Sequence, residues 1–167
     1  VFEISKILEE FDKKIKLGFS KTRLKVVLGN IKIVSKLINS SFPDYESVIP
    51  KDNDQIMIVD CKSFSETIDR VSTISNEKFR TVKFDISNNT CVVSSFGNDK
   101  SIGTESVSVE FSGSEISINF NARYILDVLN IIKTGTVKFH FSKNTAPTIL
   151  ESDSVKNSIF LIMQMRA

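Results

Sequence analysis

The sequence has few of the residues on which most metal and catalytic sites depend. Its 167 residues include one histidine and two cysteines, and neither a CxxC pair nor a histidine near a cysteine suggests a metal site or a disulfide framework. Cys61 and Cys91 are interpreted as reduced core thiols of a cytoplasmic protein. The phosphate-binding patterns GxxxxGK[ST] and GxGxxG are absent, so no nucleotide-binding loop is visible. We therefore expect no cofactor and no metal ion.

Long apolar runs are also missing. No run approaches the roughly 18 residues that a membrane span needs, so no membrane partner is expected. The chain opens with Val1-Phe2-Glu3-Ile4, without an initiator methionine or a signal-peptide pattern, which indicates a fragment or a processed product. Hydrophobic residues make up 41% and charged residues 25%, as in an ordinary globular protein.

The charge is unevenly distributed along the chain. Val1–Asn39 contains nine Lys/Arg and four Asp/Glu, a net charge of +5, so the remainder carries −3 of the total of +2. A basic segment of this kind permits contact with phosphate groups, but it is more often a solvated surface. Charge alone leaves nucleic-acid binding open.

Two isolated polar features invite a catalytic or metal-binding interpretation. Strand alternation places His140 on a solvent-facing side beside Lys138, but no Ser, Cys or Asp stands at an interpretable spacing for a catalytic group. Asp52-Asn53-Asp54 resembles the start of a calcium loop, but Met57 and Ser63 occupy the positions that need Gly and Glu. The sequence gives no positive reason to expect an enzyme.

Apolar residues recur at helical spacing in three places, Phe2–Phe11, Phe64–Ile74 and Tyr124–Ile132. Asn121 is expected to cap the last helix, and Lys133–Gly135 to end it. Turns at Gly29-Asn30, Ser87–Asn89 and Ser112–Ser114 are expected to join neighbouring strands as hairpins. The segments with a strand pattern are Lys14–Ser20, Arg23–Leu28, Lys32–Ile38, Gln55–Asp60, Arg80–Ser87, Thr90–Phe96, Glu105–Phe111, Glu115–Asn119, Thr136–Ser142, Thr148–Ser152 and Ser158–Met165.

The pattern of Ile4–Lys21 recurs 122 residues later at Leu126–Lys143, where Phe141-Ser142-Lys143 matches Phe19-Ser20-Lys21. In both places a predicted helix is followed by three predicted strands, which indicates a tandem domain. Residues 1–50 would be the end of one copy plus a linker, and residues 51–167 a complete second copy. The complete copy reads β-α-β4-α-β3, an α+β fold with two helices packed on antiparallel sheets.

Two apolar segments have an open interpretation. The C-terminal segment Phe160–Ala167 is apolar almost to its last residue, and it predicts either a buried final strand or an adaptable recognition surface containing Met163 and Met165. The segment Phe42–Tyr45, followed by Val48-Ile49-Pro50, is either a linker or part of a ligand site where the two copies meet.

These segments resemble the bacterial DNA polymerase III beta sliding clamp family. The matching segments follow the order and spacing of that family and cover essentially the whole chain: Ser35–Asn39 with Phe42–Tyr45 and Val48–Pro50, Ser75–Arg80, Phe120-Asn121 with Tyr124–Leu129, and Met163–Arg166.

The resemblance implies a bacterial, cytoplasmic, non-catalytic processivity factor, an accessory subunit of the DNA polymerase III holoenzyme. Such subunits have three similar domains and form a head-to-tail homodimer around duplex DNA, here including the end of the second domain and all of the third. The resemblance assigns sequence-independent DNA contacts to Lys6, Arg70, Lys78, Arg80 and Arg123. It assigns a dimer contact to Thr73 and Ile74, which pairs with a first domain that this chain lacks.

The resemblance also implies a hydrophobic cleft that captures short linear peptides of the polymerase III alpha subunit, the clamp loader and repair polymerases. Its residues would be Pro43, Val48, Asn121, Tyr124, Leu161, Met163, Gln164, Met165 and Arg166. Gln164 replaces the family's usual proline, and Ser47 replaces a common arginine, which leaves the peptide preference open. Two alternatives stand beside the clamp: a stand-alone peptide-binding module without a role on DNA, and an α+β enzyme with an unrecognised site.

Overall fold

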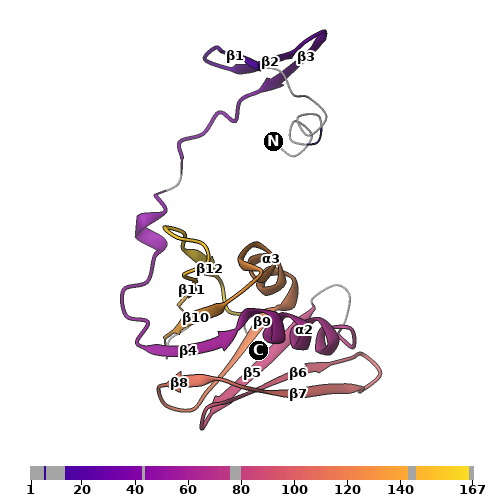
Figure 1. Cartoon of the computed structure of the whole chain (residues 1–167), viewed down its shortest axis with the longest axis vertical. Helices are drawn as coiled ribbons and strands as arrows, with labels where there is room; N and C mark the ends of the chain where they lie inside the picture. The colour runs from indigo at the N-terminus through magenta and orange to yellow at the C-terminus, as the bar shows by residue number, and fades with distance from the viewer. Residues whose placement is uncertain (1–5, 7–13, 43, 76–79, 143–145, 166–167) are drawn as a thin grey trace. The chain divides into compact units, whose positions relative to one another are not determined.

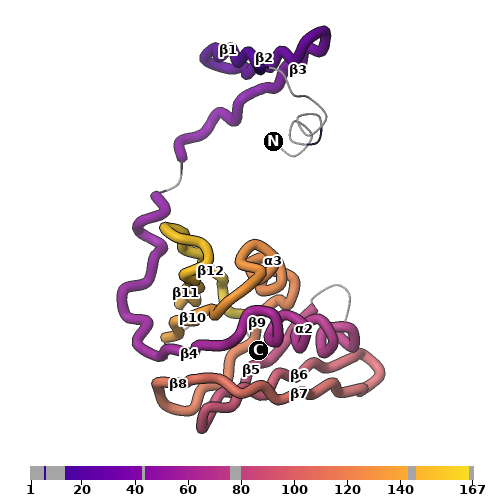
Figure 2. The backbone as a smooth tube through the Cα atoms, in the orientation of Figure 1, coloured from indigo at the N-terminus to yellow at the C-terminus, as the bar shows by residue number. Residues whose placement is uncertain are grey.

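The computed structural model describes residues 6, 14–42, 44–75, 80–142 and 146–165. The chain divides into two compact units, Val1–Pro43 and Asp44–Ala167, whose elements are labelled in Figure 1 and whose backbone is traced in Figure 2. The predicted helix over Phe2–Phe11 lies outside the described residues apart from Lys6, which is exposed. None of the described helices is long and apolar enough to cross a membrane.

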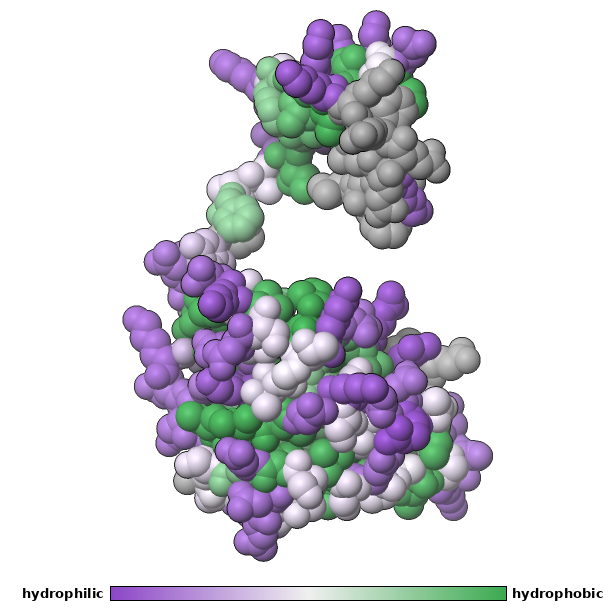
Figure 3. All heavy atoms as spheres, in the orientation of Figure 1, coloured by the Kyte–Doolittle hydropathy of each residue, from purple (hydrophilic) through white to green (hydrophobic). Residues whose placement is uncertain are grey.

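The smaller unit contains an antiparallel sheet of three strands in the order β1-β2-β3. Its strands are β1 (Lys16–Phe19), β2 (Arg23–Leu28) and β3 (Ile31–Lys36). The predicted turn at Gly29-Asn30 joins β2 to β3, and Gly29 has a φ of 55°, which glycine adopts without steric cost. Hydrophilic side chains gather along one side of this unit (Figure 3).

The larger unit has two antiparallel sheets and two α-helices. The sheets have the strand orders β12-β11-β10-β4-β8 and β7-β6-β5-β9, so the predicted α+β class with antiparallel sheets is confirmed. The elements are η1 (Glu46–Val48), β4 (Gln55–Asp60), α2 (Cys61–Ser72), β5 (Thr81–Ser87), β6 (Thr90–Phe96), β7 (Ile102–Ser108), β8 (Glu110–Ser112), β9 (Ile116–Asn121), α3 (Ala122–Ile132), β10 (Thr136–Phe141), β11 (Thr148–Glu151) and β12 (Phe160–Ile162).

One predicted strand, Glu105–Phe111, is wrong because the structure contains two strands there. β7 and β8 lie in different sheets, and the chain changes sheet at Val109, whose N–H donates to the Asn89 carbonyl at 2.9 Å. The Phe111 N–H donates to the Asn89 side chain at the same distance. The turn at Ser112–Ser114 therefore joins β8 and β9, which lie in different sheets. The prediction that this turn closes a hairpin is wrong.

Both helices begin and end at residues suited to those positions. Asp60 caps α2 by accepting from the Ser63 N–H at 2.8 Å, and Asn121 caps α3 as predicted. α3 ends at Lys133, with a φ of 65°, so the predicted stop is confirmed. Tyr124 differs from the rest of its predicted apolar stripe because its side chain is exposed.

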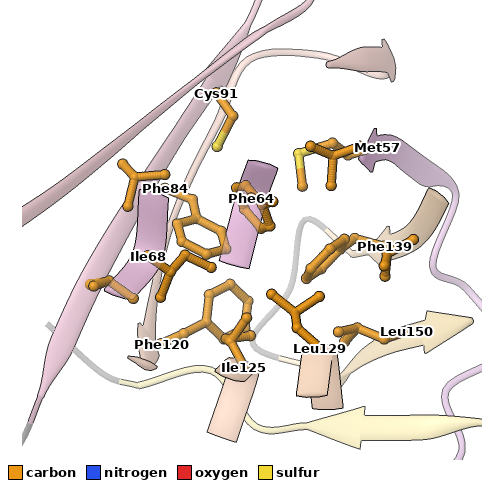
Figure 4. Close-up of a cluster of buried hydrophobic side chains, with 14 of the residues drawn as sticks. Met57, Phe64, Ile68, Phe84, Cys91, Phe120, Ile125, Leu129, Phe139 and Leu150 are labelled. Atoms are coloured by element: carbon orange, nitrogen blue, oxygen red, sulfur yellow. The ribbon is translucent and has the colours of Figure 1, made fainter. Parts of the chain in front are cut away.

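A cluster of phenylalanines holds the larger unit together (Figure 4). The ring of Phe64, on α2, lies edge-on to Phe84 of one sheet at 5.2 Å and to Phe139 of the other at 5.5 Å. Phe120 and Phe141 extend the cluster, and all five side chains are fully buried. Because Phe64 contacts both sheets, α2 fixes the position of one sheet against the other.

Candidate functional site

The start of α3 presents two residues of the expected peptide cleft. The Asn121 Oδ1 accepts a hydrogen bond from the Arg123 N–H at 3.0 Å, which fixes the first turn of the helix. Tyr124 follows in that turn with 58% of its surface exposed. Since Ile125 and Val128 are buried, Tyr124 lies on the solvent side of α3.

The C-terminal segment runs to the same place. β12 contacts α3 (Figure 1), and beyond β12 the Met165 N–H donates to the Asn119 carbonyl at 2.8 Å, two residues before Asn121. The Thr81 hydroxyl lies 3.8 Å from the Met165 sulfur. The segment therefore crosses from the sheet of β12 to the sheet of β9.

Side chains of this segment alternate between the core and solvent. Ile162 is 4% exposed and belongs to the core, whereas its neighbours Leu161 and Met163 are exposed, Met163 by 64%. The interpretation as a buried final strand holds for Ile162. Leu161 and Met163 present apolar surface to solvent instead.

Gln164 has an unusual environment within this segment. Its Nε2 is inaccessible to solvent, and among the described residues it has no hydrogen-bond partner. A buried donor without a partner costs about 1–3 kcal/mol. The proline that the resemblance implies at this position would carry no such side-chain group.

The remaining cleft residues lie on the segment that leads into the larger unit or outside the described residues. Val48 is the last residue of η1 and is exposed. The Ser47 hydroxyl donates to the Asp44 carbonyl at 2.7 Å, which closes this turn. Pro43 and Arg166 lie outside the described residues.

Arg70, one of the expected DNA contacts, is engaged within the protein. Its Nη2 and Nε contact the two Glu105 carboxylate oxygens at 2.5 and 3.1 Å. The hydrogen bond from Arg70 lowers the pKa of Glu105 and raises the pKa of Arg70. Arg70 thus reaches a phosphate only in competition with Glu105.

Arg80 and Arg123 lie close together at the start of α3. The Ala122 N–H donates to the Arg80 carbonyl at 2.8 Å, and both arginines are exposed. Lys6 belongs to the other unit and is exposed, and Lys78 lies outside the described residues. The structure therefore brings together two of the five residues.

Thr73 and Ile74 end α2 beside the edge strand β7. A Cβ added at Gly103 of β7 would come within 2.7 Å of the Ile74 side chain, so glycine permits this close contact. At the same end, Phe96 and Ile102 form an exposed cross-strand pair between β6 and β7. The sequence reasoning missed this pair, although two large apolar residues flanking the polar turn 97–101 were a visible signal.

The described residues contain no cluster of three or more His, Cys, Asp or Glu that would hold a metal ion. His140 lies opposite the buried face of β10, with its Nε2 3.5 Å from Glu151. Both cysteines are buried, and burial raises the pKa of Cys91 to about 12. A thiol with this pKa is a poor nucleophile, as expected of a core residue.

Known proteins match this chain along almost its whole length. It is 29% identical over 166 residues to the beta sliding clamp of Pseudomonas aeruginosa and 28% identical over 166 residues to that of Escherichia coli K12. Each match covers 99% of this chain and 45% of the relative, so the chain spans about half the length of these relatives.

Solved structures give the same result. The match to the crystal structure of the C. crescentus beta sliding clamp covers 99% of this chain and 45% of that chain, with a TM-score of 0.90 and 31% identity. A Pseudomonas aeruginosa sliding clamp bound to griselimycin has a TM-score of 0.85 and 29% identity over the same shares of the two chains. The family model described as DNA polymerase III beta subunit, C-terminal domain, matches residues 46–166. This chain therefore belongs to the DNA polymerase III beta subunit family.

Proposed function

We propose that the chain is part of a bacterial sliding clamp, a ring subunit that tethers the replicative polymerase to duplex DNA. The observation that carries the proposal is the match of residues 46–166 to the family's C-terminal domain, together with relatives named as sliding clamps along 99% of the chain. Residues 1–50 would supply the end of the middle domain and a linker, and residues 51–167 the complete C-terminal domain.

The proposed mechanism is topological and needs no catalytic group. A closed ring leaves circular DNA only by opening, so its contacts with DNA need neither strength nor sequence specificity. Arg80 and Arg123, which lie together at the start of α3, are the strongest of the proposed DNA contacts. Lys6, Arg70 and Lys78 complete the set, with Arg70 weakened by its pairing to Glu105.

Partner proteins would bind the surface around α3 and the C-terminal segment. Tyr124, Leu161 and Met163 are exposed apolar side chains there, and methionines suit a surface that accepts several peptides. The cleft would be completed by Pro43, Val48, Asn121, Gln164, Met165 and Arg166. The proposed ligands are short linear peptides of the polymerase III alpha subunit, the clamp loader and repair polymerases.

The dimer contact would lie at the edge strand β7. An edge strand carries unpaired backbone N–H and C=O groups that a strand of another subunit can pair with. Thr73, Ile74, Phe96 and Ile102 surround this edge with apolar surface. In the full-length protein this edge would meet a first domain of the second subunit, head to tail.

The test is retention of the full-length protein on nicked circular DNA after loading by the clamp loader. We expect the loaded protein to remain on the circle through gel filtration and to be lost when a restriction enzyme linearises it. Retention that survives linearisation would show binding by affinity and exclude the ring. Turnover abolished by a single polar substitution, for example at His140, would instead support an enzyme.

A further inference from the structure

One face of the β1-β2-β3 sheet is strongly basic. Val26 of β2 pairs with Leu17 and Ile33, so these three apolar residues share one face of the sheet. The positions between them share the opposite face, which we call the basic face. Its residues are Lys16, Gly18, Arg23, Lys25, Val27, Lys32, Val34 and Lys36.

The five cations of the basic face have no acidic neighbours within their own three strands. Residues 13–43 contain eight Lys/Arg and no Asp or Glu. All five side chains are exposed, and within the described part of the chain none of them forms an ion pair. Arg23 pairs directly with Lys36 across two strands, and like charges in that position repel. A bound polyanion would relieve this repulsion.

The related three-stranded arrangement in the larger unit shows that the fold does not require a basic face. There the outward-facing side chains of β10 have acidic neighbours. Lys138 lies 3.7 Å from Asp153, and His140 lies 3.5 Å from Glu151. The uniform positive charge is therefore a property of the β1-β2-β3 sequence and not of this strand arrangement.

The basic face is also hollowed. A shallow cavity of about 410 Å³ is lined by Gly18, Phe19, Ser20, Arg23, Lys25 and Val34. Gly18 has no side chain to fill the space beside Lys25, so the two cations Arg23 and Lys25 border an open depression. A phosphate group placed there would contact both.

We propose that the basic face binds the phosphate backbone of duplex DNA without sequence preference, at residues other than the DNA contacts proposed above. The strand positions of this face carry only Lys, Arg, Gly and Val. They offer no amide for reading base edges. Among the residues that line the depression Phe19 is the one aromatic ring, whereas single-strand platforms stack successive bases on several rings. Duplex DNA carries one charge about every 1.7 Å of helix axis, and lysines contact it through phosphate alone.

The test compares two triple variants of this chain with the same change in net charge. One variant is Lys16→Gln, Lys25→Gln, Lys32→Gln on the basic face, and the control is Lys51→Gln, Lys100→Gln, Lys156→Gln, all exposed in the larger unit. Affinity for a fluorescent linear duplex is measured by anisotropy over a range of salt concentrations. Enclosure plays no part with linear DNA, so the result is independent of whether the ring forms.

We expect the basic-face variant to lose about tenfold or more in affinity, and its slope of log K against log salt to shrink by about 2.7, or 0.9 for each lost phosphate contact. The control should bind as the unchanged chain does. The three single variants, each expected to lower the slope by about 0.9, give the same answer if the triple variant does not fold.

Three results would overturn the proposal. The first is no measurable binding of the duplex by the unchanged chain, and the second is an equal loss in the control variant. The third is tighter binding of a poly-glutamate peptide than of a duplex of equal charge, with the same dependence on the basic face. That outcome would identify an acidic protein segment as the partner instead of DNA.

Discussion

Among single residues, Arg70 and Glu105 form the closest ion pair in the described part of the chain. The pair joins α2 to β7 through two hydrogen bonds, and Thr67 donates a third to the same carboxylate at 3.2 Å. A fork of two parallel N–H donors suits a carboxylate better than a single lysine does. Arg70 therefore has a structural role whether or not DNA approaches it.

This pair predicts a pH dependence of stability. The Arg70 hydrogen bond lowers the pKa of Glu105 below its ordinary value of 4.5. The charged form of this carboxylate is therefore more favourable in the folded state than in the unfolded state. The resulting stabilisation is fully present above pH 4.5 and is lost as the pH falls through the lowered pKa of Glu105. We expect Glu105→Gln to lower the free energy of unfolding near neutral pH and to have little effect in acid, measured by urea denaturation.

The control for this prediction is the Arg70→Gln background. With the guanidinium removed, Glu105→Gln should no longer change the pH dependence of unfolding, because the interaction that lowered the pKa is gone. An unchanged pH dependence in the Glu105→Gln single variant would mean that the pair contributes nothing in solution, as many exposed pairs do not.

Gln164 provides a second prediction at this scale. Its buried Nε2 has no partner among the described residues, so Gln164→Met, similar in size and without the donor, should raise the free energy of unfolding by about 1 kcal/mol. Gln55 is the matched control, since its Nε2 is also buried without a partner while its Oε1 accepts from the Ser114 N–H at 3.1 Å. Gln55→Met should destabilise by about 1 kcal/mol because that bond is lost. Destabilisation by Gln164→Met would reveal a partner for this amide in solution.

At the scale of elements, the helices of the larger unit were predictable because each has a complete set of local signals. α3 has a capping Asn121, buried residues at helical spacing and a stop at Lys133–Gly135. α2 buries Phe64, Ile68 and Val71, spaced four and three residues apart. These signals act within one or two turns, so the sequence alone carries them.

The break between β7 and β8 was not predictable from the same kind of pattern. Val107 and Val109 are buried and Phe111 packs against the core, so apolar residues alternate without interruption through the change of sheet. The alternation persists because both sheets face one shared core. What breaks the strand is the pair of hydrogen bonds to Asn89, a contact between distant residues that no local period reports.

The exposed residues of the candidate site were likewise not predictable from local sequence patterns. Helical spacing grouped Tyr124 with Ile125 and Val128, but the angle at which α3 packs leaves Tyr124 in solvent. The apolar C-terminal segment was open to two interpretations, and the pairing of β12 with β11, followed by the Met165 to Asn119 hydrogen bond, defines which side chains face inward. Tertiary packing, absent from any local pattern, decides both cases.

At the scale of the whole molecule, two three-stranded antiparallel arrangements, β1-β2-β3 and β12-β11-β10, occur in the two units. The predicted repeat places Phe19-Ser20 and Phe141-Ser142 at corresponding positions, and in the structure Phe19 ends β1 and Phe141 ends β10. The two arrangements differ in charge, since acidic side chains lie beside Lys138 and His140 of the second, whereas residues 13–43, which contain the first, include no Asp or Glu. One strand arrangement thus presents two different surfaces.

The proposed partner site assigns stability and recognition to adjacent residues of the C-terminal segment. Deleting Met163–Ala167 from the full-length protein should abolish binding of a fluorescent peptide from a partner polymerase, and should also lower stability because the Met165 to Asn119 bond is lost. Met163→Ala should weaken peptide binding by about 5- to 30-fold, a loss of 1–2 kcal/mol, with the unfolding free energy unchanged, because Met163 is exposed. Fluorescence polarisation and urea denaturation measure the two quantities.

Ile162→Ala is the matched control one residue earlier. Ile162 is buried, so its truncation should cost about 2–5 kcal/mol of stability while the folded protein still binds the peptide. If Met163→Ala left peptide affinity unchanged, the surface around α3 would not be the partner site. A loss of binding in the deletion variant would not rescue the proposal, because the deletion also removes a hydrogen bond between the two sheets. The contrast between these neighbours follows directly from strand alternation, which turns one side chain into the core and the next toward solvent, where the proposed peptide would bind.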